Sequence, residues 1–297
     1  MPSWTGRHFI GSLAAAQQSA FDGSGLRTLD WFGWAVCTLG GLLLLRWLIS
    51  LRGGDPLTRC PVRRHRLPAW FVPVQLLVWM IGTVLIASVI KAAVPSDRPS
   101  LLEAALHGGI ILWYLHLAAL FLAVAHFGFV RGLKGFGLDF RRIRKDFFIA
   151  AATLCALLPL IVLALEGTYQ IGRFFFGPDF TMDRHTSLSA LQDCPQVWIR
   201  LLILVNAVLV VPVFEEILFR GLLQSVLTAA LGRPWLSIAV VSILFAAMHP
   251  YPTHLSALVI LSIGLGYAYE KSGSLWQPIF IHILFNGINV AAVLLGA

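Results

Sequence analysis

The polar residues between positions 215 and 286 are the part of this sequence best equipped for chemistry. They comprise two carboxylates, a guanidinium, two imidazoles and a carboxamide, all inside apolar sequence: Glu215, Glu216, Arg220, His249, His282 and Asn286. A charged group at membrane depth is costly unless it is paired or hydrated, so such residues are functional candidates by default. The combination predicts a hydrolytic site that uses water.

Helical spacing divides the first three of these residues into a pair and a free carboxylate. Neighbouring residues of an α-helix point in different directions, so Glu215 and Glu216 do not share a face. Glu216 and Arg220 are four residues apart and do share one, so we expect an internal ion pair. Glu215 is then free to face a cavity and to take a proton from water. The alternative is a packing network in which all three residues are structural.

The two histidines each have a neighbour one helical turn away. His249 precedes Pro250, so its helix must end there, and Phe245 lies one turn earlier where it can wall a cavity. His282 and Asn286 share a face, and both can donate hydrogen bonds to an oxyanion. A metal site is also chemically open, although Asn is a poor zinc ligand.

The depths of these residues favour one common site. Glu215 and His249 lie at similar distances, roughly 20–24 Å, on either side of the turn at 231–234, so an antiparallel helix pair brings them level. His282 follows the turn at 272–274 by only a few residues. Its expected depth therefore matches less well, and we expect a kink, a tilt or a long cavity to reconcile it with the others.

The surrounding sequence is typical of a membrane protein. The 297 residues are 58% hydrophobic and only 12% charged, with a mean hydropathy of +0.81, whereas soluble domains have about 25% charged residues. The apolar runs are long enough to cross a bilayer as helices and lack the alternation of a β-barrel. We therefore expect an all-α, polytopic bundle of about eight transmembrane helices at 31–51, 69–94, 104–130, 147–166, 197–229, 235–249, 254–270 and 277–296.

The net charge of +8 comes mainly from two basic connectors, at 52–68 and 131–146, and is not a nucleic-acid signal. Cytoplasmic loops are rich in Lys and Arg, so both connectors are expected on the cytoplasmic side and connector 167–196 on the other. The expected parts are an N-terminal arm that can be interfacial, N-terminal transmembrane helices, a basic linker and a C-terminal part with a core at about 197–296. Their limits are 1–30, 31–130, 131–146 and 147–297.

At these residues the sequence resembles the CPBP family of intramembrane proteases, which includes CAAX prenyl endopeptidases and bacteriocin-immunity relatives. The matching segments are Glu215–Gly221, Phe245–His249 and His282–Asn286, with further similarity at Gly264–Tyr267 and Ser272–Leu275. Each segment alone is a weak signal, but their ordered set is specific. The resemblance covers roughly residues 197–296, and the N-terminal half shares only its membranous character.

The resemblance implies an intramembrane endopeptidase of the glutamic type. It implies that Glu215 and His249 activate the attacking water, that His282 and Asn286 bind the oxyanion, and that no metal is needed. Glu216, Arg220 and Phe245 are the supporting residues. Zinc is the alternative cofactor, with Glu215, His249 and His282 as its ligands.

The expected partners are the bilayer and a membrane-associated protein or peptide, prenylated or carrying a sorting signal, with no nucleic acid. The expected location is the cytoplasmic membrane of a bacterium or archaeon, as a multi-pass protein. Two other classes stay open: a non-catalytic scaffold or immunity factor of the same fold, and a transporter. Against transport, the sequence shows no duplicated half with paired broken helices.

Overall fold

The protein is a bundle of helices. The computed structural model describes residues 31–58, 60, 63–183 and 196–294, so the expected arm at 1–30 lies outside the described residues. Within the described ranges the chain forms helices and one isolated antiparallel bridge, between His65 and Phe129, but no extended strand. The expected class, an all-α membrane helix bundle, is confirmed.

All eight expected helices form, and several short ones join them. The 197–231 segment is one long helix in which α8, α9 and α10 are separated by two π-helical segments, η4 and η5. The elements are α2 Trp31–Ser50, α3 Phe71–Ala93, α4 Pro99–Gly128, α5 Gly132–Phe136, α6 Ile143–Phe176, α8 Val197–Val205, η4 Asn206–Val210, α9 Val211–Glu216, η5 Ile217–Gln224, α10 Ser225–Leu231, α11 Pro234–Ala247, α12 Leu255–Ser272 and α13 Trp276–Leu294, with 3₁₀ turns η2 Leu51–Gly53, η3 Phe140–Arg142 and η6 Pro252–His254.

Three expected helix limits were wrong, among them the start of α6, which lies at Ile143 rather than at 147. α4 begins at Pro99 rather than at 104, because proline at the first position of a helix loses no hydrogen bond. α6 continues to Phe176 rather than ending at 166. There the Gln170 amide donates to the Glu166 carboxylate one turn earlier, at 2.6 Å, and Tyr169 is buried, so this polar stretch extends the helix instead of ending it.

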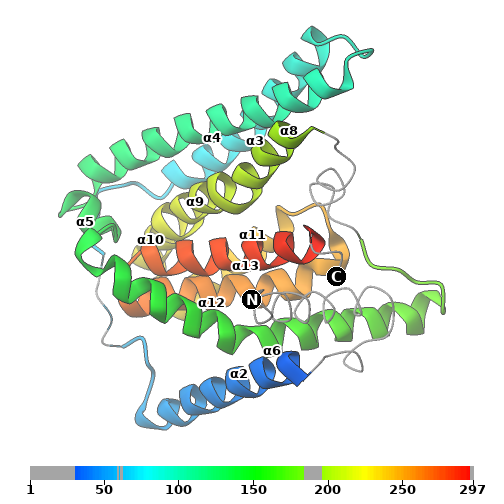
Figure 1. Cartoon of the computed structure of the whole chain (residues 1–297). Helices are drawn as coiled ribbons and strands as arrows, with labels where there is room; N and C mark the ends of the chain where they lie inside the picture. Colours follow the sequence, from blue (N-terminus) through cyan, green and yellow to red (C-terminus); the bar gives the residue numbers. More distant parts are fainter. Residues whose placement is uncertain (1–30, 59, 61–62, 184–195, 295–297) are drawn as a thin grey trace, which may run out of the picture.

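The bundle places the C-terminal helices at its centre. α11, α12 and α13 lie between α3, α4 and the long 197–231 helix on one side and α2 and α6 on the other (Figure 1). One hydrophobic core joins α3 and α4 to the long helix, and a second joins α6 to α12 and α13. The candidate site residues are therefore held inside protein rather than against lipid.

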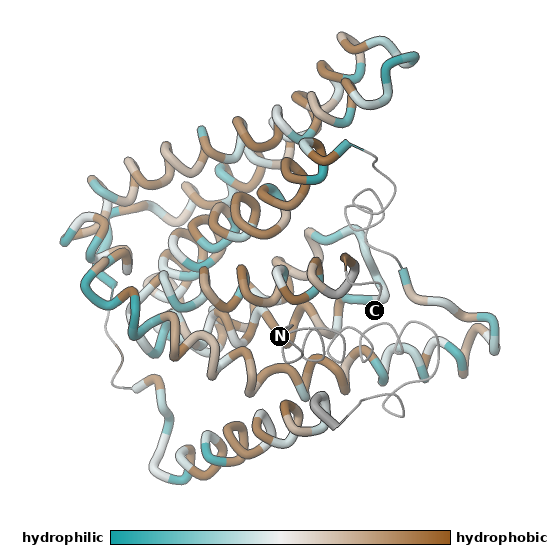
Figure 2. Tube along the Cα trace, viewed as in Figure 1, coloured by the Kyte–Doolittle hydropathy of each residue, from teal (hydrophilic) through white to brown (hydrophobic). Residues whose placement is uncertain are grey.

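Several helices have the length and composition of membrane spans. Hydrophobic residues dominate their middle parts, whereas hydrophilic residues gather near the ends of the bundle, notably around α5 (Figure 2). The segments that are long and apolar enough to cross a membrane are Gly33–Gly53, Phe71–Ala93, Pro99–Gly128, Phe140–Phe176 and Val197–Leu231. α11 is a shorter apolar helix. These features make the chain an integral membrane protein.

The two basic connectors meet at one end of the bundle (Figure 1). The backbone N–H of Arg66 donates to the carbonyl of Gly128, and that of Val130 donates to Arg64. The connector 131–146 is itself packed, since Phe136 is fully buried in the same core as α3 and α4. The expectation that both connectors lie on one side agrees with these contacts.

Candidate active site

The helix that carries the two glutamates is locally irregular. Glu215 and Glu216 end the short α9, which lies between the π-helical segments η4 and η5. π-helical turns within α-helices occur frequently at functional sites. The main-chain carbonyl of Ala207, in the first π-helical segment, accepts a hydrogen bond from the Asn286 amide at 2.9 Å, which ties α13 to this helix.

The expected ion pair between Glu216 and Arg220 is confirmed. Arg220 Nη1 lies 3.0 Å from Glu216 Oε1, and both side chains are fully buried. Arg220 Nη2 donates to the Ser262 hydroxyl at 2.6 Å, and the guanidinium lies over the Phe245 ring at 4.5 Å from its centroid. The arginine is thus held by a carboxylate, a hydroxyl and an aromatic face.

His282 joins this pair to the second carboxylate. Its Nδ1 lies 2.7 Å from the same Glu216 oxygen that Arg220 contacts, and its Nε2 lies 3.8 Å from Glu215 Oε2. A carboxylate paired with arginine can only accept hydrogen bonds, so Nδ1 is the donor in the first contact. Glu215 is buried, and its Oε2 has no hydrogen-bond partner among the described residues.

His249 lies beside the site and contacts Phe245, which separates it from His282. Its Nδ1 lies 2.8 Å from the Phe245 carbonyl, and a carbonyl can only accept, so Nδ1 carries the proton. In the neutral ring Nε2 then has a free lone pair. The Phe245 ring is fully buried and lies 4.8 Å from the His249 ring and 5.7 Å from the His282 ring, centroid to centroid. Phe245 is the common wall of the two histidines.

The depth of His282 is explained by where α13 begins. Phe136 packs directly against the backbone of Gly221, and its neighbour Gly137 accepts a hydrogen bond from the backbone of Leu275 at 2.9 Å. α13 therefore begins level with Gly221, whereas the long helix continues to Leu231. About two further turns of α13 bring His282 to Glu216, and the mismatch needs no long cavity.

The candidate residues are thus brought together to different degrees. Glu215, Glu216, Arg220 and His282 form one chain of polar contacts, and His249 adjoins it across Phe245. Asn286 lies one turn beyond His282, and its contact is with Ala207. The Ser262 hydroxyl and the Ala207 carbonyl were missed by sequence reasoning, because a lone serine in an apolar helix and a main-chain carbonyl carry no distinguishing pattern.

Within residues 31–58, 60, 63–183 and 196–294, no group of three or more His, Cys, Asp or Glu side chains is arranged so that it could hold a metal ion. Glu215, His249 and His282 therefore do not converge as ligands in this arrangement. They form a carboxylate with one oxygen that lacks a hydrogen-bond partner among the described residues, beside two differently oriented imidazoles.

The segment that holds these side chains matches a known protein family. Residues 196–288 match the model of the Rce1-like family, described as type II CAAX prenyl endopeptidase Rce1-like. The chain has no match among curated proteins and none among solved structures. The resemblance to CPBP and CAAX proteases is therefore confirmed over residues 196–288, the segment that contains every side chain of the candidate site.

Proposed function

We propose that the protein is an intramembrane endopeptidase in which Glu215 is the general base. The observation that carries this proposal is the buried chain Arg220–Glu216–His282, which ends beside a Glu215 oxygen that has no hydrogen-bond partner among the described residues. Buried polar atoms are nearly always hydrogen-bonded, so an unpartnered carboxylate oxygen in such a cluster has capacity for substrate or water. The match to a peptidase family supports the same function.

The reaction begins with the activation of water. Glu215 takes one proton from the water while the water oxygen attacks the carbonyl carbon of the scissile peptide. His249 Nε2 accepts a hydrogen bond from the other O–H of the water. The carbonyl electron pair moves to its oxygen and forms a tetrahedral oxyanion. When the oxyanion collapses, the C–N bond breaks and Glu215 returns its proton to the leaving amine.

His282 and Asn286 stabilise the oxyanion. In the doubly protonated state His282 can donate from Nε2 while Nδ1 stays with Glu216. Asn286 has two amide protons, and the contact with Ala207 occupies one of them. Oriented donors at the position of the developing charge are a major source of rate enhancement in acyl transfer.

The substrate is a protein anchored at the membrane, since Glu215 lies in a helix that is apolar enough to span a bilayer. The family description further names prenyl endopeptidases of CAAX proteins. The substrate class tested first is therefore a peptide with a lipid-modified cysteine close to its carboxyl terminus. The same peptide without the lipid distinguishes a lipid-dependent protease from a general one.

The test of the base is the change Glu215→Gln, measured as peptide cleavage by the purified protein in vesicles. Gln keeps the volume of Glu but cannot accept the proton, so cleavage should fall by about 10²–10⁴-fold, with the thermal unfolding midpoint unchanged. Glu103→Gln, an exposed carboxylate of α4, is the matched control and should cleave like the wild type. Full activity of Glu215→Gln would remove Glu215 from the mechanism.

We further propose that hydrolysis needs no bound transition metal. A catalytic zinc site usually takes three protein ligands, and the nearby guanidinium of Arg220 disfavours a dication. Metal analysis of dialysed, active enzyme, followed by titration with zinc, tests this proposal. Activity independent of zinc is the expected result. Stoichiometric zinc that tracks activity would turn Glu215, His249 and His282 into ligands and leave the peptidase assignment intact.

A further inference from the structure

A strongly basic pocket lies at the end of the bundle where the two connectors meet. Its volume is about 520 Å³, and its walls come from the 52–68 connector, from the 131–146 connector and from the turn between α12 and α13. Its charged lining consists of five cationic side chains and one carboxylate: Arg63, Arg64, Arg131, Lys134, Arg142 and Asp139. The charged side chains thus converge on one concavity from two separate parts of the sequence, and the turn between α12 and α13 completes its wall.

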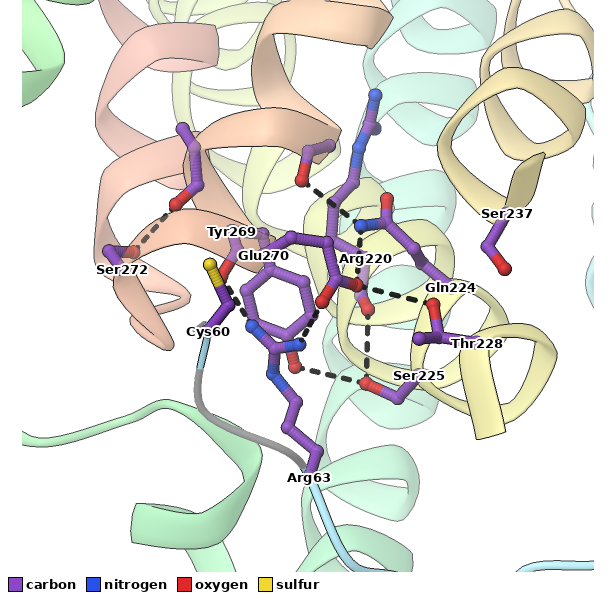
Figure 3. A network of polar contacts seen from close by, with 12 residues as sticks. Cys60, Arg63, Arg220, Gln224, Ser225, Thr228, Ser237, Tyr269, Glu270 and Ser272 are labelled. Carbon is purple, nitrogen blue, oxygen red and sulfur yellow. Dashed lines mark hydrogen bonds and ion pairs between the residues drawn. The ribbon is translucent and has the colours of Figure 1, made fainter. Parts of the chain in front are cut away.

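Most of this positive charge is not neutralised within the described part of the chain. Arg63 is paired with Glu270 at 2.9 Å, as Figure 3 shows. The other four cationic side chains are exposed, and none of them forms an ion pair with the described residues. Asp139 is engaged, since one of its oxygens accepts from the backbone of Arg141. The pocket therefore has a net positive charge, which is suited to an anion.

Apolar residues beside the pocket indicate which anion it takes. Val130 lines the pocket and is 64% exposed, and Phe127 and Phe140, in the segments on either side, are 82% and 69% exposed. α4 ends at Gly128 and α6 begins at Ile143, so this surface lies where membrane-spanning segments reach the interface. A free phosphate needs the cationic groups alone, whereas a phospholipid also needs an apolar rim for its acyl chains.

We propose that this pocket binds the phosphate headgroup of an anionic phospholipid from the adjacent leaflet. Basic pockets between helices at the cytoplasmic side of a membrane protein are suited to anionic headgroups, and arginine matches phosphate oxygens with paired hydrogen bonds. The binding is a property of the connectors and does not depend on the peptidase reaction.

The floor of the pocket gives the headgroup a fixed place. Gly137 adopts a positive φ of 106°, and a side chain at that position would meet the backbone nitrogen of Leu275 at 2.8 Å. The Tyr269 hydroxyl donates to the carbonyl of Phe136 at 2.9 Å. These contacts hold α5 against the beginning of α13, so Lys134 of α5 and Arg131 just before it project from a rigid base.

The test uses the full chain in phosphatidylcholine vesicles that contain a small fraction of dansyl-labelled lipid. Energy transfer from the tryptophans to dansyl-phosphatidylglycerol, relative to dansyl-phosphatidylcholine, measures enrichment of the anionic lipid. The pocket variant combines Arg131→Gln, Lys134→Gln and Arg142→Gln. The control variant combines Arg141→Gln, Arg144→Gln and Lys145→Gln, which are exposed residues of the same connector outside the pocket. Both variants lose the same charge.

Wild type and control variant should enrich the anionic probe, and the pocket variant should not. Each basic residue near an anionic headgroup changes affinity by about fivefold, so the combined loss is more than tenfold. An equal decrease in both variants would overturn the pocket and leave a general surface charge effect. Displacement of the probe by inorganic phosphate at constant ionic strength would reassign the site to free phosphate, and displacement by a soluble acidic peptide would reassign it to a protein segment.

Discussion

Among the residues that the structure describes, two buried arginine–glutamate pairs are alike in their contacts and different in their surroundings. Arg220 lies 3.0 Å from Glu216 in the candidate active site, and Arg63 lies 2.9 Å from Glu270 near the basic end of the bundle. Each guanidinium also lies over an aromatic ring, at 4.5 and 3.5 Å from the centroid. The type of pair therefore does not distinguish a reactive site from a structural one.

The difference lies in how completely the carboxylates are satisfied. Glu270 receives Arg63 on one oxygen and the side chains of Gln224 and Thr228 on the other (Figure 3). One oxygen of Glu216 accepts hydrogen bonds from both Arg220 and His282, and its other oxygen has no partner among the described residues. The neighbouring Glu215 also has an oxygen without such a partner. A buried carboxylate with partners on both oxygens rigidifies a fold, whereas a buried carboxylate oxygen left without a partner calls for a functional explanation.

The largest expected contrast between the two regions is catalytic. Glu216→Gln removes the charge that orients His282 and should lower kcat/KM by about 10²-fold or more. Glu270→Gln should leave kcat/KM unchanged and instead lower the free energy of unfolding by about 1–3 kcal/mol, because Arg63 loses its charged partner. Peptide cleavage and denaturant unfolding of both variants measure the contrast. Equal losses of activity would show that the Glu270 network belongs to the active site.

The second contrast concerns stability. Arg220→Ala leaves Glu216 deeply buried beside Glu215 and should cost about 3–5 kcal/mol. Arg63→Ala should cost less, about 1–3 kcal/mol, because Glu270 keeps two donors. Unfolding of the purified variants in one detergent gives both values.

A double variant tests the pair in the active site directly. Replacing both Glu216 and Arg220 with Met removes the two charges together, so it should be more stable than Arg220→Ala alone, although inactive. A double variant less stable than Arg220→Ala would mean that the two residues stabilise the fold through other contacts.

The Glu216–Arg220 pair was predictable because its geometry is local: a spacing of four on a helix determines it. The contacts of Arg220 with Ser262 and of Arg63 with Glu270 were not predictable. Both partners come from another helix, so these contacts depend on how the helices pack. The sequence offers one weak sign of Glu270, which is an acid at the end of an apolar run. The start of α13 depends on the contact between Phe136 and Gly221, which sequence spacing does not encode.

The smallest expected effect concerns the connector that Arg63 holds. Cys60 lies three residues before Arg63 and is half-buried, and burial raises the pKa of its thiol above the usual value. The thiolate is the reactive form, so labelling of Cys60 should be slow at neutral pH and should accelerate as the pH rises towards that raised pKa. Arg63→Ala should free the connector, expose the thiol and bring its pKa back towards the ordinary range. Loss of the guanidinium charge acts in the opposite direction, but burial is the larger cause.

The measurement uses a chain in which Cys60 is the sole cysteine, with Cys37, Cys155 and Cys194 changed to Ala. An impermeant maleimide should label it in inside-out vesicles but not in intact cells, because the Lys/Arg-rich connector is expected on the cytoplasmic side. In those vesicles Arg63→Ala should raise the labelling rate severalfold, whereas Arg52→Ala, an exposed arginine of the same connector, should not. Labelling in intact cells would reverse the topology. Equal labelling rates in the two arginine variants would mean that the Arg63–Glu270 pair does not hold the connector against the bundle. That pair could then no longer be described as the structural counterpart of Glu216 and Arg220.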